Sequence, residues 1–176
     1  MPHAITLIRS ASLPSVAEYA YSATAPAQSR LIFLAWACPL NEDGSTAATG
    51  DYAGQAAKTI ENMRIALADA GASLEDVLST RVLVASTRHE DLVAAWEVVR
   101  DSFGDHDVPS TLMGATVLGY KDQLVEIEVV AAIPDMKATP HRRRLRKAQM
   151  MTIFDLMVRV PGRRISVRGR KARSSA

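Results

Sequence analysis

The chain has 176 residues, 48% of them hydrophobic, and a formal net charge of +2 at pH 7. This length and composition predict one globular domain with a real apolar core. No stretch reaches the roughly eighteen uncharged apolar residues that a membrane-spanning helix needs, and the first ten residues lack the basic start and apolar run of a secretory signal. We therefore predict a cytoplasmic protein with no membrane partner.

The charge is distributed unevenly along the chain. Residues 1–134 hold eight Lys and Arg against seventeen Asp and Glu, whereas residues 135–176 hold thirteen against two. The sequence thus predicts a folded acidic domain over 1–134, followed by a basic C-terminal extension over 135–176 that is flexible.

Three strands are predicted in the N-terminal part of the chain, over 3–9, 18–25 and 30–40. The third, RLIFLAWACPL, is the clearest, and a loop rich in turn-forming residues follows it. Cys38 is the single cysteine, so it cannot form an internal disulfide, and its apolar neighbours favour a buried small residue over a reactive thiol.

Two helices are predicted next, with a strand between them. Apolar residues recur at steps of three and four from Tyr52 to Ala70, and Gly71 then supplies a stop signal. SLED (73–76) has the form of a short helix start, before a strand over 77–86. A capping box from Thr87 to Glu90 predicts a second helix over 88–103.

Two further strands, about 110–118 and 123–133, are predicted on either side of the turn GYKD. The order of strands, helix, strand, helix and strands indicates an α+β chain, in which two helices pack on one face of a mixed β-sheet. The uncovered face needs a partner, which a second subunit can supply.

The last predicted strand carries two carboxylates, Glu126 and Glu128, in the motif VEIE. Because side chains alternate across a strand, both glutamates share one face, and an all-apolar set including Val125 and Ile127 shares the other. Two interpretations are open at this point: both glutamates are solvated, or one of them lines a cleft at a subunit interface.

Two stretches of the sequence carry a family resemblance. The first is EYAYSATAPAQSRLIFLAWACPLNEDG (18–44), and the second is GASLEDVLSTRVLVASTRHEDLVAAWEVVRDSFGDHDVPSTLMGATVLGYKDQLVEIEVVAA (71–132). Together they resemble the Rid family (reactive intermediate deaminases, also called RidA/YjgF), and the first stretch resembles that family's first hairpin.

This resemblance implies a chorismate-mutase-like subunit that forms a homotrimer, with clefts between subunits that bind small carboxylates or imines. The best-known members hydrolyse 2-imino acids to 2-keto acids and ammonia without a metal or cofactor. In them an arginine on the strand before the last pairs with the substrate carboxylate, and a glutamate on the last strand helps to hold the attacking water. Preorganised groups in a mostly dry cleft suit this chemistry.

Mapped onto this chain, the resemblance makes Glu126 the catalytic residue and Tyr19 the tyrosine of the first hairpin. Ser110 takes the position of the arginine, with Thr111 beside it, and a serine cannot form the bidentate clasp of a guanidinium. We therefore predict an arginine-lacking subgroup in which Tyr19, Ser110 and Thr111 bind substrate.

Two other positions bear on this cleft. Lys121, in the predicted turn, is the nearest basic residue in sequence to Ser110. Trp36 stands in a stretch where relatives usually carry glycine. For Tyr19 and Tyr21, which share one face of a strand, packing and ligand contact are equal alternatives.

No metal site is predicted, because GDHD (104–107) reads as a solvated turn whose adjacent side chains cannot converge on one ion. Three functions remain open: an imine deaminase, a non-catalytic small-ligand-binding trimer, and an RNA-associated, endoribonuclease-like protein that uses the basic extension.

Overall fold

The structure is a computed structural model that describes residues 5–14 and 18–135, with the backbone but not the side chain of Trp36. The predicted basic extension over 135–176 lies outside the described residues, apart from Asp135. Among the described residues, no helix combines the length and apolar character needed to cross a bilayer.

The described residues form two helices, one short 3-10 helix and six strands. In chain order these are β1 (Thr6–Ile8), β2 (Ser22–Thr24), β3 (Ser29–Ala37), α1 (Tyr52–Asp69), η1 (Leu74–Asp76), β4 (Val77–Val84), α2 (His89–Phe103), β5 (Ser110–Gly114) and β6 (Val125–Pro134). The predicted order of elements is confirmed, with β1, β2 and β5 shorter than expected.

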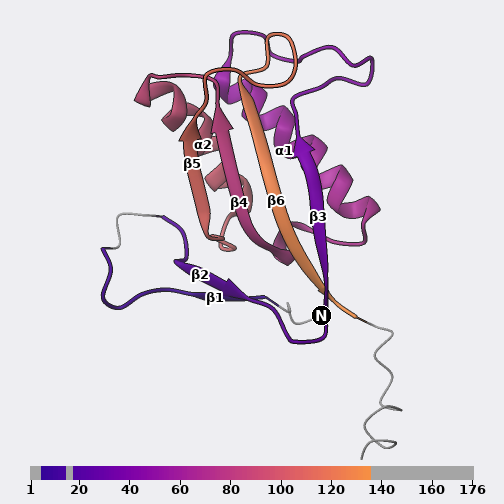
Figure 1. Cartoon of the computed structure of the whole chain (residues 1–176), viewed down its shortest axis with the longest axis vertical. Helices are drawn as coiled ribbons and strands as arrows, with labels where there is room; N and C mark the ends of the chain where they lie inside the picture. Colours follow the sequence, from indigo (N-terminus) through magenta and orange to yellow (C-terminus); the bar gives the residue numbers. More distant parts are fainter. Residues whose placement is uncertain (1–4, 15–17, 136–176) are drawn as a thin grey trace, which may run out of the picture. The chain divides into compact units, whose positions relative to one another are not determined.

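Four of the strands form a mixed sheet in the order β3-β6-β4-β5, and β1 pairs with β2 in a separate two-stranded sheet. β6 runs antiparallel to both β3 and β4, whereas β4 and β5 are parallel. Figure 1 shows α1 and α2 behind the four-stranded sheet, where α1 packs on β3 and β6 and α2 packs on β4 and β5. The α+β prediction with two helices on one face is confirmed.

Two predicted strand pairings, each in a hairpin, are wrong. β5 and β6 do not pair, because β4 lies between them, and β2 pairs with β1 instead of β3. The segment between β4 and β5 contains α2, and such a helical connection brings a strand back parallel to the preceding one. Residues 115–124 then cross from β5 to the far side of β4, a span that a tight turn cannot provide.

Helix α1 fixes the loop that precedes β6. Asp51 caps the helix by accepting a hydrogen bond from the Gly54 N–H at 3.0 Å. On the buried face, the Gln55 amide donates to the Asp122 carbonyl (2.9 Å) and accepts from the Leu124 N–H (2.7 Å). A helix side chain thereby satisfies backbone groups of the loop that leads into the acidic strand.

The capping box predicted at Thr87 and Glu90 is wrong. Helix α2 has Arg88 at its N-cap position, without a side-chain cap. Ser86 takes over part of the task, since its hydroxyl accepts from the Arg88 N–H (3.0 Å) and donates to Asp91 (2.6 Å). The short helix start predicted at 73–76 is present as a capping box, with the Ser73 N–H donating to the Asp76 carboxylate at 2.9 Å.

The two faces of the sheet differ in character. The alternate residues of β6 from Val125 to Ala131 are completely or almost completely buried, in the core that the helices cover. On the opposite face, which no helix covers in Figure 1, Leu31 and Phe33 of β3 leave 52% and 72% of their surface exposed. This outer face carries the glutamates of β6.

Candidate functional site

The two glutamates of β6 stand opposite different partners on the neighbouring strand β4. In the antiparallel register, Glu126 faces Leu83 and Glu128 faces Arg81. Neighbouring strands lie about 5 Å apart, so these cross-strand pairs are in direct reach of one another. The register therefore gives one carboxylate an apolar neighbour and the other a guanidinium.

Glu126 is buried within its own chain. Only 5% of its surface is exposed, and the Gln123 amide donates a hydrogen bond to its carboxylate at 2.9 Å. Burial raises the pKa of Glu126, and the hydrogen bond from Gln123 partly offsets that increase. A carboxylate with a raised pKa is a better proton acceptor than a solvated one, which suits a general base.

The Cys38 thiol belongs to the same surroundings. Burial raises its pKa, the negative charge of Glu126 raises it further, and a hydrogen bond with Gln123 acts in the opposite direction. Because the thiolate is the nucleophilic form, these shifts make the thiol less reactive. Cys38, directly after β3, is only half-buried, and its environment favours the predicted structural role over a reactive thiol.

Glu128 forms an ion pair with Arg81. The Nη1 atom of Arg81 lies 2.7 Å from Oε2 of Glu128, with side chains that are 51% and 32% exposed, respectively. The same Oε2 atom is buried and accepts no hydrogen bond. The guanidinium therefore neutralises the carboxylate by proximity, while its N–H groups are not aligned on that oxygen.

A pocket of about 340 Å³ lies on the outer face beside this ion pair. Its floor comes from β4, β5 and β6, and its wall from residues 19–21. The lining residues are Tyr19, Ala20, Tyr21, Ser79, Thr80, Arg81, Pro109, Ser110, Thr111, Glu128 and Val130. Glu126 is outside this set; it lies two residues along β6 from Glu128, roughly 7 Å at the rise of a β-strand.

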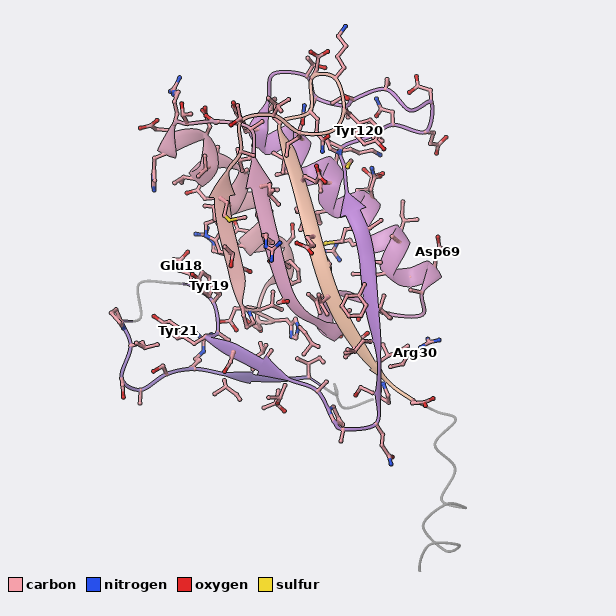
Figure 2. The ribbon with its side chains drawn as sticks, viewed as in Figure 1. Glu18, Tyr19, Tyr21, Arg30, Asp69 and Tyr120 are labelled. Atoms are coloured by element: carbon pink, nitrogen blue, oxygen red, sulfur yellow. The ribbon has the colours of Figure 1, made fainter. Side chains whose placement is uncertain are left out.

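The wall is anchored beside the start of β5, where Figure 2 shows Glu18, Tyr19 and Tyr21. The Ala20 N–H donates to the Asp107 carbonyl at 2.7 Å, and Glu18 forms an ion pair with Arg100 of α2. The Tyr19 ring meets the Trp96 ring edge to face, with centroids 5.9 Å apart. Tyr19 therefore packs against α2 and also lines the pocket, and contact with a ligand stays a prediction.

Ser110 and Thr111 occupy opposite faces of β5. The Ser110 hydroxyl donates to the Val108 carbonyl (3.0 Å) and lies 2.7 Å from the Thr80 hydroxyl. Since a hydroxyl has one hydrogen to donate, Ser110 has none left for a carboxylate while that bond persists. Thr111 is exposed and stands in register beside Arg81.

The structure places a basic residue in this pocket that sequence reasoning missed. Lys121 does not line the pocket, and its carbonyl accepts a hydrogen bond from Thr46. Arg81 does line it. The sequence did contain a signal for Arg81, which is the sole charged residue of the strand VLSTRVLV. Because side chains alternate across a strand, Val82 and Val84 share the core face and Arg81 points to the opposite face.

Two other predictions about the site concern the turn GDHD and the side chain of Trp36. Within the described residues, no group of three or more His, Cys, Asp and Glu side chains gathers where it could hold a metal ion. In GDHD, the His106 ring contacts the Val77 carbonyl (2.9 Å) and Asp107 pairs with Arg9. The Trp36 side chain, predicted to affect the cleft, lies outside what the structure describes.

Comparisons with known proteins agree on one family. The family model described as Endoribonuclease L-PSP matches residues 11–133. A RutC family protein of Pyrococcus abyssi is 31% identical over 100 residues, which span 57% of this chain and 76% of that protein.

Two solved structures show the same fold. The conserved Rid family protein YyfB of Yersinia pestis superposes with a TM-score of 0.67 at 22% identity, over 74% of this chain and 99% of YyfB. A Mycobacterium tuberculosis member of the YjgF/YER057c/UK114 family gives a TM-score of 0.50 at 27% identity, over 73% of this chain and 99% of the other. The chain belongs to the Rid (RidA/YjgF) family, whose sequence model is described as Endoribonuclease L-PSP.

Proposed function

We propose that this protein hydrolyses small 2-imino acids to 2-keto acids and ammonia, in a cleft that a neighbouring subunit completes. The observation that carries the proposal is the pocket on the outer face, because it gathers Tyr19, Ser110 and Thr111 beside the acidic strand β6. Family membership supports this reaction type, and we place the chain in a subgroup that lacks the arginine on the strand before the last.

Glu126 acts as the general base in this proposal. It holds a water and takes one proton from it as the water oxygen bonds to the carbon of the protonated imine, which gives a carbinolamine. Glu126 returns that proton to the nitrogen, and it then accepts the remaining hydroxyl proton as the carbon–nitrogen bond breaks, so that the keto group forms and ammonia leaves. Its burial and its raised pKa support the role, since such a carboxylate accepts a proton more readily than a solvated one. The Gln123 amide orients the carboxylate.

The homotrimer is part of the proposal. Leu31 and Phe33, together with Met113 of β5, which is 38% exposed, form an apolar surface on the face that no helix covers. Exposed apolar patches of this kind mark subunit contacts. A neighbouring chain that packs here would cover the outer face and exclude water from the pocket.

A coupled assay tests the reaction. An amino-acid oxidase generates imines, semicarbazide traps those that remain, and the rate of trapping reports imine survival. We expect wild-type protein to reduce trapping and Glu126→Gln to lose about a hundredfold or more of that activity. Glu97→Gln, at an exposed position of α2, is the matched control. No reduction by wild type, or equal reduction by Glu126→Gln, contradicts the proposal.

RNA binding is the second candidate, because the family model is described as an endoribonuclease. The domain over 1–134 is acidic, so the basic residues of 135–176 would have to provide the contacts. RNA affinity of the full chain that falls steeply with salt, and vanishes in a chain ending at Asp135, would favour this candidate. Equal absence of binding in both chains at low salt would eliminate it.

A further inference from the structure

We propose that Arg81 of β4 is the carboxylate-binding residue of the pocket and that Glu128 of β6 faces the positively charged nitrogen of the same ligand. The inference rests on the proposed function for its reaction and deepens it by assigning the charge selectivity. In the family, the guanidinium stands at the position that Ser110 of β5 takes in this chain. Arg81 stands on the neighbouring strand, β4.

The position of Arg81 supports this assignment. It lies in register between Thr111 on β5 and Glu128 on β6, all on the face without helices, and all three line the pocket. Half of its side chain is exposed, so a ligand can reach it. An arginine at the centre of a sheet, with a hydroxyl beside it, provides the donors that Ser110 lacks.

The bonding of Arg81 leaves capacity for a ligand. A guanidinium has five N–H donors, and among the described residues its interaction is the ion pair with Glu128, whose Oε2 accepts no hydrogen bond. A ligand carboxylate can therefore take a bidentate pair of N–H groups without displacing Glu128. An ion pair with side chains as exposed as these contributes little to stability, so a purely structural role is a weak explanation for it.

The nearby carboxylate restricts which anion fits. Glu128 Oε2 lies 2.7 Å from Arg81 Nη1, so a simple carboxylate bound to Arg81 also meets a like charge. An α-amino or α-iminium acid carries its positive nitrogen on the carbon next to its carboxylate, and can satisfy both groups. The pair thus selects ligands of mixed charge over simple anions.

Titrations with three ligands of one skeleton test the inference: propanoate, L-alanine and neutral propanamide, followed by NMR chemical shifts of the full-length protein. We expect L-alanine to bind more tightly than propanoate, and propanamide to bind most weakly. Arg81→Ala should weaken L-alanine and propanoate by about tenfold to a hundredfold. Arg81→Lys should restore part of the affinity, because the charge returns without the planar fork.

Glu128→Gln distinguishes a binding role from a purely structural one, because loss of structure would weaken the binding of both ligands. Loss of the carboxylate should tighten propanoate binding and weaken L-alanine binding, a change of opposite sign for the two ligands. Arg88→Ala, at an exposed ion-paired position outside the pocket, is the control and should change neither. Unchanged affinities in Arg81→Ala, no binding to wild type, or shifts of the same sign in Glu128→Gln would overturn the inference.

The experiments distinguish failure of the deaminase proposal from failure of the inference about Arg81 and Glu128. If wild type hydrolyses imines and Arg81→Ala leaves kcat/KM unchanged, the role of Arg81 is wrong and the deaminase proposal stands. If wild type shows the predicted ligand pattern without imine hydrolysis, the binding inference stands and the deaminase proposal fails.

Discussion

The two glutamates of β6 differ in environment although they lie two residues apart on one face. Glu128 is balanced by Arg81, whereas Glu126 is buried beside Leu83 and receives one hydrogen bond from Gln123. Burial of a carboxylate favours its neutral form, so an ionised Glu126 lowers the free energy of unfolding, and the size of this effect depends on pH. A residue kept at such a cost is a candidate for function.

The pH dependence of stability follows from the raised pKa of Glu126. The folded state holds this proton more tightly than the unfolded chain, so the stabilising effect is present below the ordinary value of 4.5 and is lost as pH rises through the raised pKa. We expect Glu126→Gln to have a higher Tm than wild type at pH 8 and an equal Tm at pH 4, measured by calorimetry at one protein concentration. Glu97→Gln should follow wild type at both pH values; a lower Tm for Glu126→Gln at pH 8 would contradict this account.

At the scale of elements, the parallel pair β4 and β5 sets the geometry of the pocket. The pairing places Thr111 beside Arg81 and turns Ser110 toward Thr80. It also brings the end of β5 against the segment before α2, where Gly114 approaches the Ser86 carbonyl. Glycine is required there because a Cβ atom would meet a backbone oxygen, which cannot move away as a flexible side chain could.

Gly114→Ala tests this close approach. A Cβ atom at Gly114 would lie 2.7 Å from the Ser86 carbonyl oxygen, so β5 or residues 84–88 must shift. We expect a loss of about 1–3 kcal/mol in the free energy of unfolding, measured by urea denaturation. Gly119→Ala is the matched control, since its Cβ would meet its nearest neighbour, Gln123 Oε1, at 3.9 Å. Equal midpoints for the two variants would show that the strand adjusts freely.

At the scale of the whole molecule, one face of the sheet is covered by helices and the other exposes apolar side chains. Phe33 and Leu31 are each more than half exposed in the single chain. The proposed trimer would bury this surface, and its free energy of association would derive largely from the apolar area removed from water.

Phe33→Glu should disrupt the assembly. A charge at the centre of the buried patch has no partner, so we expect the main species in sedimentation velocity to change from trimer to monomer at micromolar concentration. Ile65→Glu, at an exposed position of α1 on the helical side, should leave the trimer intact. A wild-type protein that sediments as a monomer would eliminate the proposed cleft between subunits.

The basic extension is predicted to be dispensable for the fold. The family model ends at residue 133, and every residue of the helix-covered core precedes that point. We expect a chain ending at Asp135 to keep the oligomeric state of the full chain and its Tm within a few degrees, by light scattering and calorimetry. Aggregation or dissociation of the shortened chain would show that residues 136–176 contribute to assembly.

The sequence by itself determined the order of elements, the inward face of β6 and the family, because periodicity and local motifs depend on neighbouring residues. It also placed Glu126 and Glu128 on one face through strand alternation. Strand pairing and register needed the tertiary structure, since they depend on contacts between residues far apart in the chain. Local turn signals suggested a hairpin between β5 and β6, but β6 is inserted between β3 and β4. That insertion, together with the parallel pairing of β4 and β5, decided that Arg81 stands between Thr111 and Glu128, and it gave the pocket a guanidinium that no local pattern around Ser110 could reveal.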